Sequence, residues 1–583
     1  MASVDAPIGG TAARSGGRSR ASGPLVIAAA AVAVVVVAAL LGRGYLANDD
    51  DILVEFFRAD AEAPFVAAAL SRAMRAAYAA APALPWFGLW LYAVHALAFG
   101  VTAGALVDLP AGTPRPLARA TWIGAGIALA ASAALALRPT YGNTAIAGCC
   151  AGLVALASEL TRPGGARTGR ALWAGLAVAA GLATRLEAIA ASVAATAPLF
   201  AAIGWRMLRA RRFVRPGPVL ALLGPAVVVL AVGALLPTDE DAIAQRYRAF
   251  NAARHALHFQ GAYVDLDRRA PELLARAGWT SERYWRFTNR FYFVDDWYTP
   301  ERLRRLHDTG GAPRPVWTIL PTHLRDAQRS AGYGATLLAA VAVAAIALAL
   351  LGPIQRSAAA LAVGHLGWLL VVAIALQRWM HFPDRIAVPM AIGAACAALI
   401  ALRRGVVTPA WATAIPWRRP GPALALVAAA ALTLATAVRV EDFRTVRTDV
   451  PPCAELERRI ADRRPALVVS YLEPSCLGQP LRAAPRPYPS VTLTWPIFSP
   501  PFYRGLARLD VRDARDLVAA LAAHRDAFVL VRRRYLDQVI RGFSTPGTRV
   551  TLSEVDATGP GATDLVLARV ERHEDPAASG TPG

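Results

Sequence analysis

The sequence predicts a mainly α-helical membrane protein that crosses the bilayer about eleven times and ends in a small α/β domain. Hydrophobic residues make up 55% of the 583 positions, and charged residues only 18%, well below the quarter that is usual in soluble proteins. Apolar stretches long enough for membrane helices recur between residues 24 and 438. Arginines gather in alternate short links between these stretches, which is the charge bias of a protein with a fixed orientation in the membrane.

A transmembrane helix needs about 20 consecutive, mostly apolar residues. Eleven stretches qualify as candidate spans, namely 24–42, 85–107, 121–137, 142–160, 171–184, 188–205, 218–237, 333–351, 359–376, 386–402 and 422–438. The fifth stretch is short, and its boundary with the sixth is weakly marked. If those two formed one broken helix, the number of spans and the side of every later link would change.

The arginines predict an orientation with the N-terminus inside and the C-terminus outside. The links that would face the cytoplasm hold eighteen arginines against two acids, Asp5 and Asp108. The short links on the other side hold only Arg138, Arg185, Arg378 and Arg385. Because basic residues are retained on the cytoplasmic side, three larger segments are expected outside: loops 43–84 and 238–332, and the tail 439–583.

Residues 1–23 are rich in Gly, Ser, Ala and Arg and are expected to form a disordered cytoplasmic N-terminus. A signal peptide is the competing interpretation of the basic residues before an apolar run. The apolar run 25–41 is longer than a usual signal-peptide core, and no convincing cleavage site follows it. We therefore expect a retained first helix, and a transmembrane domain that extends over residues 24–438.

The net charge of +21 raises the question of nucleic-acid binding. Such binding requires a basic face on a folded module, whereas much of the excess here lies in short links between apolar segments. The charge therefore reports membrane topology, and no nucleic-acid partner is expected.

Residues 439–583 are expected to form an extracytoplasmic α/β domain. Buried strands are predicted at 467–472, 527–531 and 564–570, and a helix at 513–524 leads into the second of them. The phosphate-binding patterns GxGxxG and GxxxxGK are both absent. The domain could contact an acceptor or stabilise the membrane part, and we favour the second role.

The five cysteines fit this layout. Cys149, Cys150 and Cys396 lie in predicted spans, where small apolar packing is their expected role. Cys453 and Cys476 lie in the outward tail, where oxidation is permitted. They are a candidate disulfide pair, since two cysteines allow one pairing but the sequence does not give their distance.

The acidic triplet Asp49-Asp50-Asp51 directly follows the first predicted span. Carboxylates are costly beside hydrocarbon, so three together at a membrane exit favour a functional site. A carboxylate there could deprotonate an acceptor hydroxyl, or the triplet could hold a divalent cation, the one cofactor that the sequence leaves open. The alternative is a helix N-terminus with solvated acids.

The four outward arginines Arg138, Arg185, Arg378 and Arg385 are candidates for binding a phosphate, because the planar guanidinium suits bidentate contact. For Arg185 the alternative is a snorkelled side chain paired with Glu187. His381 is expected to be structural.

The outer loop 238–332 contains a dense aromatic segment. Nine aromatic residues lie within twenty positions, namely Trp279, Tyr284, Trp285, Phe287, Phe291, Tyr292, Phe293, Trp297 and Tyr298. This density could form helices lying on the membrane, stack on sugar rings or grip a prenyl chain. Packing in a core or interface is the default expectation.

Three short motifs resemble the GT-C superfamily of polyprenyl-phosphate-sugar-dependent glycosyltransferases, which includes protein O-mannosyltransferases and lipid A aminoarabinose transferases. They are Asn48-Asp49-Asp50 after the first span, the segment 182–188 around Arg185 and Glu187, and His381-Phe-Pro-Asp384-Arg385 before a late span. The resemblance covers about residues 24–438. It implies a catalytic Asp in the first outer loop, here Asp49 or Asp50, with Arg385 favoured over Arg378 for phosphate.

The function expected from the resemblance is transfer of a sugar from a polyprenyl-phosphate donor to a glycan, lipid or protein acceptor at the outer face of the cell membrane. A transporter or flippase of lipid-linked glycans is the first alternative. Transporters usually carry internal repeats and polar residues at mid-membrane, whereas no repeat is visible here and the first and last spans are almost uncharged. A non-catalytic membrane scaffold is the second alternative.

Overall fold

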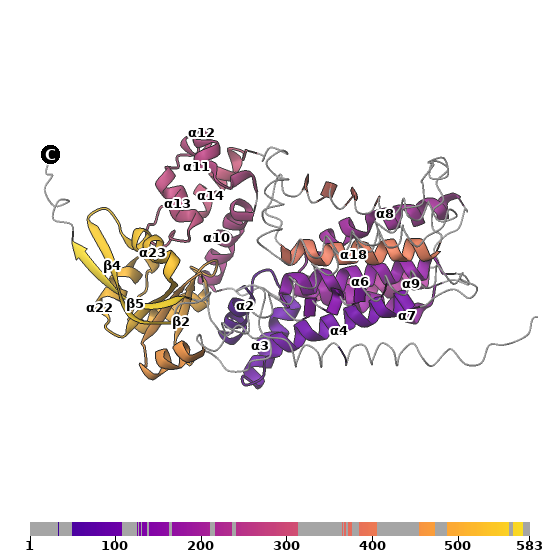
Figure 1. The fold of residues 1–583 in the computed structure, drawn as a ribbon, viewed down its shortest axis with the longest axis horizontal. Coiled ribbons are helices and arrows are strands. Elements are labelled where there is room, and N and C mark those ends of the chain that lie inside the picture. The colour runs from indigo at the N-terminus through magenta and orange to yellow at the C-terminus, as the bar shows by residue number, and fades with distance from the viewer. Residues whose placement is uncertain are drawn as a thin grey trace, which may run out of the picture.

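A computed structural model of the chain describes residues 49–107, 139–162, 166–209, 216–235, 241–259, 261–312, 384–404, 454–472, 487–558 and 564–574, with some isolated positions elsewhere. The molecule is elongated, with a bundle of long helices at one end and a β-sheet domain at the other (Figure 1). Shorter helices lie between them. A helical part followed by a small C-terminal α/β domain is the architecture that the sequence predicts.

In the part of the chain that the structure describes, six long helices form the bundle: α4 (Trp86–Val107), α6 (Tyr141–Leu160), α7 (Thr168–Thr184), α8 (Ala188–Arg209), α9 (Pro216–Leu235) and α18 (Asp384–Arg404). Among the described residues, α4, α6, α8 and α9 are long and apolar enough to cross a membrane. The predicted boundary between the fifth and sixth spans is correct, because α7 and α8 are separate helices. Spans 24–42, 121–137, 333–351, 359–376 and 422–438 lie wholly or largely outside the described residues.

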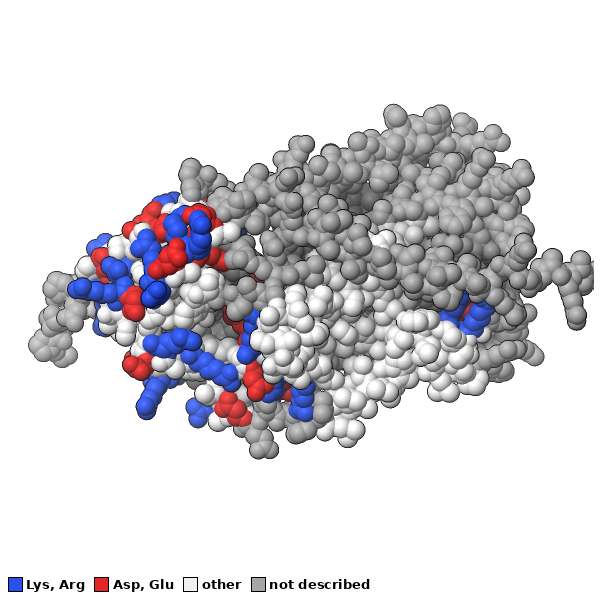
Figure 2. All heavy atoms as spheres, turned by 90° about the horizontal axis from the view of Figure 1, so that it is seen from below, with Lys and Arg blue, Asp and Glu red and all other residues white. Residues whose placement is uncertain are grey.

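The outer surface of the bundle is apolar where it is described. On α9 the side chains of Leu220, Val228 and Leu235 are 67%, 60% and 83% exposed. Figure 2 shows charged side chains gathered on the part of the molecule away from the bundle, while the described bundle surface is mostly uncharged. Apolar side chains exposed along a whole helix are stable in lipid and costly in water, so the chain is a membrane protein.

Close helix packing sets the relative directions of the three helices that carry the predicted site. A Cβ on Gly152 would lie 2.4 Å from the Ala174 carbonyl oxygen, and one on Gly181 would lie 2.6 Å from the Ala145 carbonyl oxygen. Helices α6 and α7 are therefore antiparallel and in backbone contact, as small residues allow in membranes. Gly393 of α18 packs on Cys150 in the same way.

The neighbours of α6 thus place three helix ends together. Gly142 lies beside Arg385 and Cys150 beside Gly393, so α6 and α18 run in parallel. The starts of α6 and α18 and the end of α7 consequently meet at one end of the bundle. Cys149, Cys150 and Cys396 are buried and free in this packing, as expected, whereas Cys453 and Cys476 lie outside the described residues.

The described part of the predicted first outer loop folds onto the same end of the bundle. It forms α2 (Asp49–Arg58) and α3 (Ala68–Ala80). The sequence predicts a helical stretch at 63–80 in this loop, and α3 starts five residues later. Helix α2 buries Ile52, Leu53, Phe56 and Phe57. The N–H of Ala67 donates to the carbonyl oxygen of Ala183 at 3.0 Å, which fixes the loop against the end of α7.

The described residues of the predicted second outer loop form five α-helices, α10 (Ala242–Phe259), α11 (Leu266–Arg269), α12 (Pro271–Arg276), α13 (Ser281–Thr288) and α14 (Pro300–Asp308). Its aromatic segment forms part of the hydrophobic core that also includes the β-sheet. Phe291 stacks on Tyr471 of the sheet with ring centroids 5.0 Å apart, and the hydroxyl of Tyr292 donates to the Thr494 carbonyl oxygen at 2.9 Å. The default expectation of core packing is therefore correct for these rings.

The C-terminal domain is built on five strands, β1 (Leu467–Tyr471), β2 (Ser490–Leu493), β3 (Ala527–Arg532), β4 (Thr548–Ala557) and β5 (Leu565–Glu574), in the order β2-β1-β3-β5-β4. Strand β1 pairs in parallel with β2 and β3, and β5 pairs antiparallel with β3 and β4. The three predicted strands are present. Strands β2 and β4 at the two edges were missed, because β2 has only four residues and β4 is polar and half exposed. The predicted helix at 513–524 forms as α22 (Leu517–Ala523) after a short 3₁₀ turn.

One side chain of this domain packs against the helix that carries the acidic triplet. Trp495 follows β2 and stacks on Phe56 of α2 with ring centroids 5.5 Å apart. It also meets Phe65 edge-on at 5.6 Å, and the hydroxyl of Tyr247 donates to its carbonyl oxygen at 3.5 Å. The C-terminal domain therefore supports α2 directly.

Replacing Trp495 by Ala should destabilise the protein by about 3–5 kcal/mol, the usual cost of truncating a large buried aromatic side chain. The measurement is thermal unfolding of the purified protein in detergent, together with the rate of proteolysis within residues 49–80. Trp173→Ala is the matched control, because Trp173 is 48% exposed on α7 and should change either value little. An unchanged unfolding midpoint for Trp495→Ala would contradict a supporting role for this contact.

Candidate active site

Asp50 lies at the centre of the predicted site. Its side chain is fully buried, and Oδ1 accepts a hydrogen bond from the backbone N–H of Tyr141 at 2.6 Å. Tyr141 is the first residue of α6, so the carboxylate faces the positive end of a long helix, where a negative charge is stabilised. The alternative of solvated acids is wrong for Asp50.

The other two members of the triplet are less well defined. Asp49 begins α2, but its side chain lies outside the described residues. Asp51 is partly buried. Among the described residues, no three His, Cys, Asp or Glu side chains come close enough to hold a metal ion. The residues described here therefore do not complete the cation site that the triplet leaves open.

A capping box holds the start of α6 beside Asp50. The Thr140 hydroxyl accepts from the N–H of Asn143 at 3.0 Å, and the Asn143 side chain accepts from the N–H of Thr140 at 2.8 Å. Thr144 in the next position contacts the His95 ring at 2.9 Å. The two bonds of the capping box occupy two of the backbone N–H groups that the start of a helix leaves unpaired, and Asp50 accepts from a third, that of Tyr141.

Arg185 reaches the same helix start from the end of α7. Its Nη1 donates to the Tyr141 hydroxyl at 3.4 Å, and the guanidinium lies 5.2 Å from the centre of the Tyr141 ring. Nε pairs with Glu187 at 3.3 Å. The expected pairing with Glu187 is present. However, Glu187 is 60% exposed, and an exposed ion pair contributes little to the stability of the fold. The contact with Tyr141 places Arg185 beside the helix that Asp50 caps.

Gly142 lies between the two arginines. A Cβ built on Gly142 would be 3.8 Å from Arg185 Nη1 and 3.8 Å from Arg385 Cδ. Asp50, Arg185 and Arg385 therefore converge on the first two residues of α6, although they are far apart in the sequence. Arg138, Arg378, His381 and the side chain of Asp384 lie outside the described residues.

Two residues near this point were not assigned a role from the sequence. Tyr141 bridges Asp50 and Arg185, and its only sequence signal is its place directly after the Arg138-Pro-Thr turn. His255 of α10 contacts Phe65 with ring centroids 5.2 Å apart. Burial lowers its pKa to about 4, and the charges of Arg254 and Arg185 act in the same direction. His255 is therefore neutral at pH 7 and adds no cation to the site.

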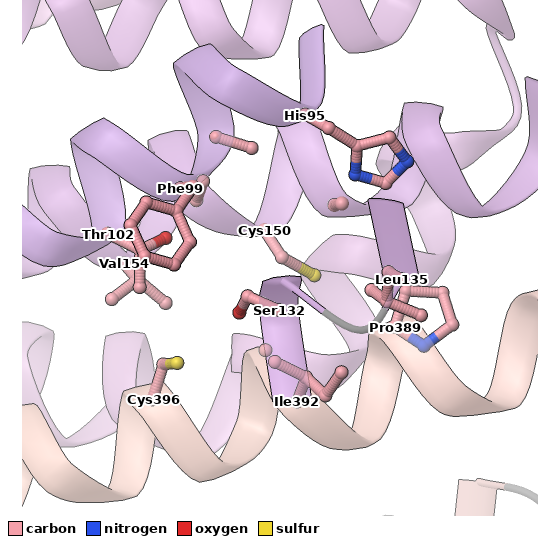
Figure 3. A pocket seen from close by; sticks show the side chains of 14 residues that line it. His95, Phe99, Thr102, Ser132, Leu135, Cys150, Val154, Pro389, Ile392 and Cys396 are labelled. Atoms are coloured by element: carbon pink, nitrogen blue, oxygen red, sulfur yellow. The ribbon is translucent and has the colours of Figure 1, made fainter. Parts of the chain in front are cut away.

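A small hollow lies deeper in the bundle, between α4, α6 and α18, and is lined by His95, Thr102, Cys150 and Cys396 among others (Figure 3). Its volume is about 20 Å³, which is room for about one water molecule. No charged side chain lines it. The hollow has no room for a substrate.

No family model and no curated protein matches the sequence. Among solved structures, the chain is similar to ArnT from Cupriavidus metallidurans bound to undecaprenyl phosphate, with a TM-score of 0.37 and 15% identity over 94% of this chain and 98% of that chain. The apo state of the same ArnT gives a TM-score of 0.36 and 14% identity with the same coverage. At these values the roles of residues must come from the contacts within this chain.

Proposed function

We propose that this protein is a membrane glycosyltransferase that moves a sugar from a polyprenyl-phosphate donor to an acceptor at the outer face of the membrane. The observation that supports this most strongly is the convergence of a buried carboxylate, two arginines and a helix N-terminus on Tyr141 and Gly142. The motifs that carry the GT-C resemblance, around Asp50, Arg185 and Arg385, are the same segments that meet there.

Asp50 is the proposed general base. In the reaction its carboxylate takes the proton of an acceptor hydroxyl as the acceptor oxygen attacks the anomeric carbon. A new C–O bond forms, the bond between the anomeric carbon and the phosphate oxygen breaks, and polyprenyl phosphate leaves with the electron pair. A carboxylate that is fixed by the Tyr141 N–H needs no reorientation during this step. Asp49 is the second candidate for the same role.

Arg185 and Arg385 are the proposed phosphate ligands. The leaving phosphate gains negative charge as the glycosidic bond breaks, so cations placed at that oxygen stabilise the transition state. The start of α6 adds the partial positive charge of its N-terminus. A carboxylate and a phosphate side by side would repel one another, and the two guanidinium groups offset that repulsion. Arg138 and Arg378 are proposed to belong to the same outward face.

The proposed topology has eleven spans, a cytoplasmic N-terminus and an extracytoplasmic C-terminal domain. The meeting of the starts of α6 and α18 with the end of α7 supports it, because the arginine bias predicts that all three ends lie on the outer side. A cysteine introduced at an exposed position of the C-terminal domain, such as Arg508, should react with a membrane-impermeant maleimide in intact cells. Labelling only after the cells are broken would contradict this topology.

The proposal is tested by incubating the purified protein in detergent with polyprenyl-phosphate-linked sugars and envelope acceptors. We expect protein-dependent release of polyprenyl phosphate and an equal amount of sugar on the acceptor. No release with any donor, combined with translocation of a lipid-linked glycan by the protein in sealed vesicles, would instead establish the flippase alternative.

Gly142 gives a variant that separates phosphate binding from folding. Alanine in place of a helical glycine should stabilise the protein by up to about 1 kcal/mol, because its Cβ would meet three side chains at ordinary contact distances of 3.8 Å. The same methyl group would occupy the space where Arg185 and Arg385 meet the helix start. We expect Gly142→Ala to raise the KM for the donor about tenfold or more while thermal stability is kept. Gly204→Ala on α8 is the control, because a Cβ there meets nothing within 4 Å. Equal donor KM values for both variants and the unchanged protein would contradict the position assigned to the phosphate.

A further inference from the structure

A second cavity, separate from the Asp50 site, lies among the helices of the second outer loop. Its volume is about 350 Å³, which is at the lower end of the range for small-molecule sites. The end of α10 contributes Leu257 and His258. Asp265 lies directly before α11, Asp267 and Arg268 lie within α11, and the remaining wall comes chiefly from α13. Helix α10 joins the two places, because Tyr247 packs beside α2 and His258 lines the cavity.

The polar part of the wall offers both acceptors and a donor. Within the described part of the chain, the side chains of Asp265, Asp267 and Arg268 form no ion pair with another residue, and all three line the cavity. Asp265 is held in a left-handed backbone conformation with φ of 51°, which fixes the turn. Asn289 and Thr288 are already bonded within α13 and to Gln538, so they shape the wall and leave recognition to the charged groups.

The apolar part of the wall comes from Leu257, Phe287 and Leu306. Trp285 also lines the cavity, and its ring is contacted by Arg541 at 3.9 Å and by Phe291 at 5.8 Å. His258 is held in place by two contacts with Arg290. The cavity is therefore rigid on one side. The other side carries the carboxylates of Asp265 and Asp267, which are not engaged in ion pairs among the described residues.

This wall discriminates between ligand classes. Two carboxylates disfavour a phosphate or another anion by charge repulsion, and the polar rim is unsuited to a prenyl chain because its charges would be desolvated. A saccharide combines hydroxyl groups, which donate to carboxylates and accept from guanidinium, with C–H faces that pack on aliphatic and aromatic surface. A saccharide therefore uses both halves of the wall.

We infer that the cavity binds a small neutral saccharide and holds part of the glycan acceptor on which the Asp50 site acts. The role of the cavity in holding an acceptor rests on the proposed function. The test does not rest on it, since binding is measured without catalysis. A second binding point would raise the effective concentration of acceptor ends near Asp50. The class of acceptor is then a glycan, in preference to the lipid or protein that the sequence leaves open.

The experiment measures binding of a set of disaccharides (maltose, cellobiose, mannobiose and N,N′-diacetylchitobiose) to the purified full-length protein by isothermal titration calorimetry and saturation-transfer NMR. At least one should bind, and Asp267→Ala should weaken that binding about tenfold or more, because a hydrogen bond to a charged group is lost. Glu272→Ala removes an exposed carboxylate on neighbouring α12 and should leave binding unchanged.

Two further measurements keep the inference separate from the proposed transferase activity. Asp50→Asn should bind the same disaccharide with unchanged affinity, so a failure of catalysis would not affect this result. In an active preparation, Asp267→Ala should raise the KM for the glycan acceptor and leave the KM for the donor unchanged. Absence of binding by all four disaccharides, or equal binding by Asp267→Ala and the unchanged protein, would overturn the inference.

Discussion

Replacing Asp50 by Asn should lower the rate of sugar transfer by roughly 10²–10⁴-fold, the range over which a positioned general base acts. Asparagine has nearly the same shape, and its Oδ1 can still accept the Tyr141 N–H that Asp50 binds at 2.6 Å. The substitution therefore removes the negative charge and the basic oxygen while the helix contact is kept. The measurement is the initial rate of transfer from a labelled polyprenyl-phosphate sugar to acceptor, at equal protein in the membrane.

Asp51→Asn is the matched control for this result. Asp51 is the next residue of α2 and is only partly buried, so we expect its variant to keep most of the activity. Asp49→Asn distinguishes the two candidates of the triplet, since only the base should show the large loss. Full activity in both the Asp50 and the Asp49 variants would remove carboxylate catalysis from the account.

Replacing Arg185 by Gln should lower kcat/KM for the donor by roughly 10²–10³-fold, as found when one charge-stabilising donor is removed from an active site. The loss should appear in kcat more than in KM, because the phosphate gains charge only as the glycosidic bond breaks. Arg185→Lys should restore part of the activity, since it keeps the charge but loses the planar pair of donors. Steady-state kinetics with varied donor concentration give both constants.

Glu187→Gln separates this role from the structural alternative. If Arg185 served only to pair with Glu187 at 3.3 Å, then removing either partner should have a similar effect. We expect the Glu187 variant to keep activity within a fewfold of normal, because the pair is exposed and such pairs are worth about 0–1 kcal/mol. Equal losses in the Arg185 and Glu187 variants would show that the pair is structural.

The long apolar helices that the structure describes could be predicted because hydrophobicity along the chain reports burial in lipid or protein directly. The break between α7 and α8 was only weakly marked, by Arg185-Leu-Glu187 between two apolar runs. Strand β4 could not be predicted, because its polar, half-exposed side chains give no apolar pattern in the sequence. The start of α3 was placed too early, since Ala63 and Ala67 lie in an irregular segment that tertiary contacts, such as Ala67 with Ala183, hold in place.

The site was predictable as a set of residue types but not as an arrangement. The position of Asp50 after a span and of Arg185 and Arg385 at span ends indicated one face of the membrane. Their meeting at α6 depends on helix directions and on close packing through Gly152 and Gly181, which no local pattern encodes. Tyr141 and His255 were missed for the same reason, because each gains its role only from a partner distant in the sequence.

The shared phosphate site is the central claim, and it is tested most directly by measuring the affinity of polyprenyl phosphate for the purified protein and for Arg185→Gln, Arg385→Gln and the double variant. Each single variant should bind about tenfold more weakly or worse. The double variant should lose less than the product of the two, because both side chains hold the same phosphate. Glu187→Gln should bind as the unchanged protein does. Undiminished affinity in both arginine variants would contradict the account.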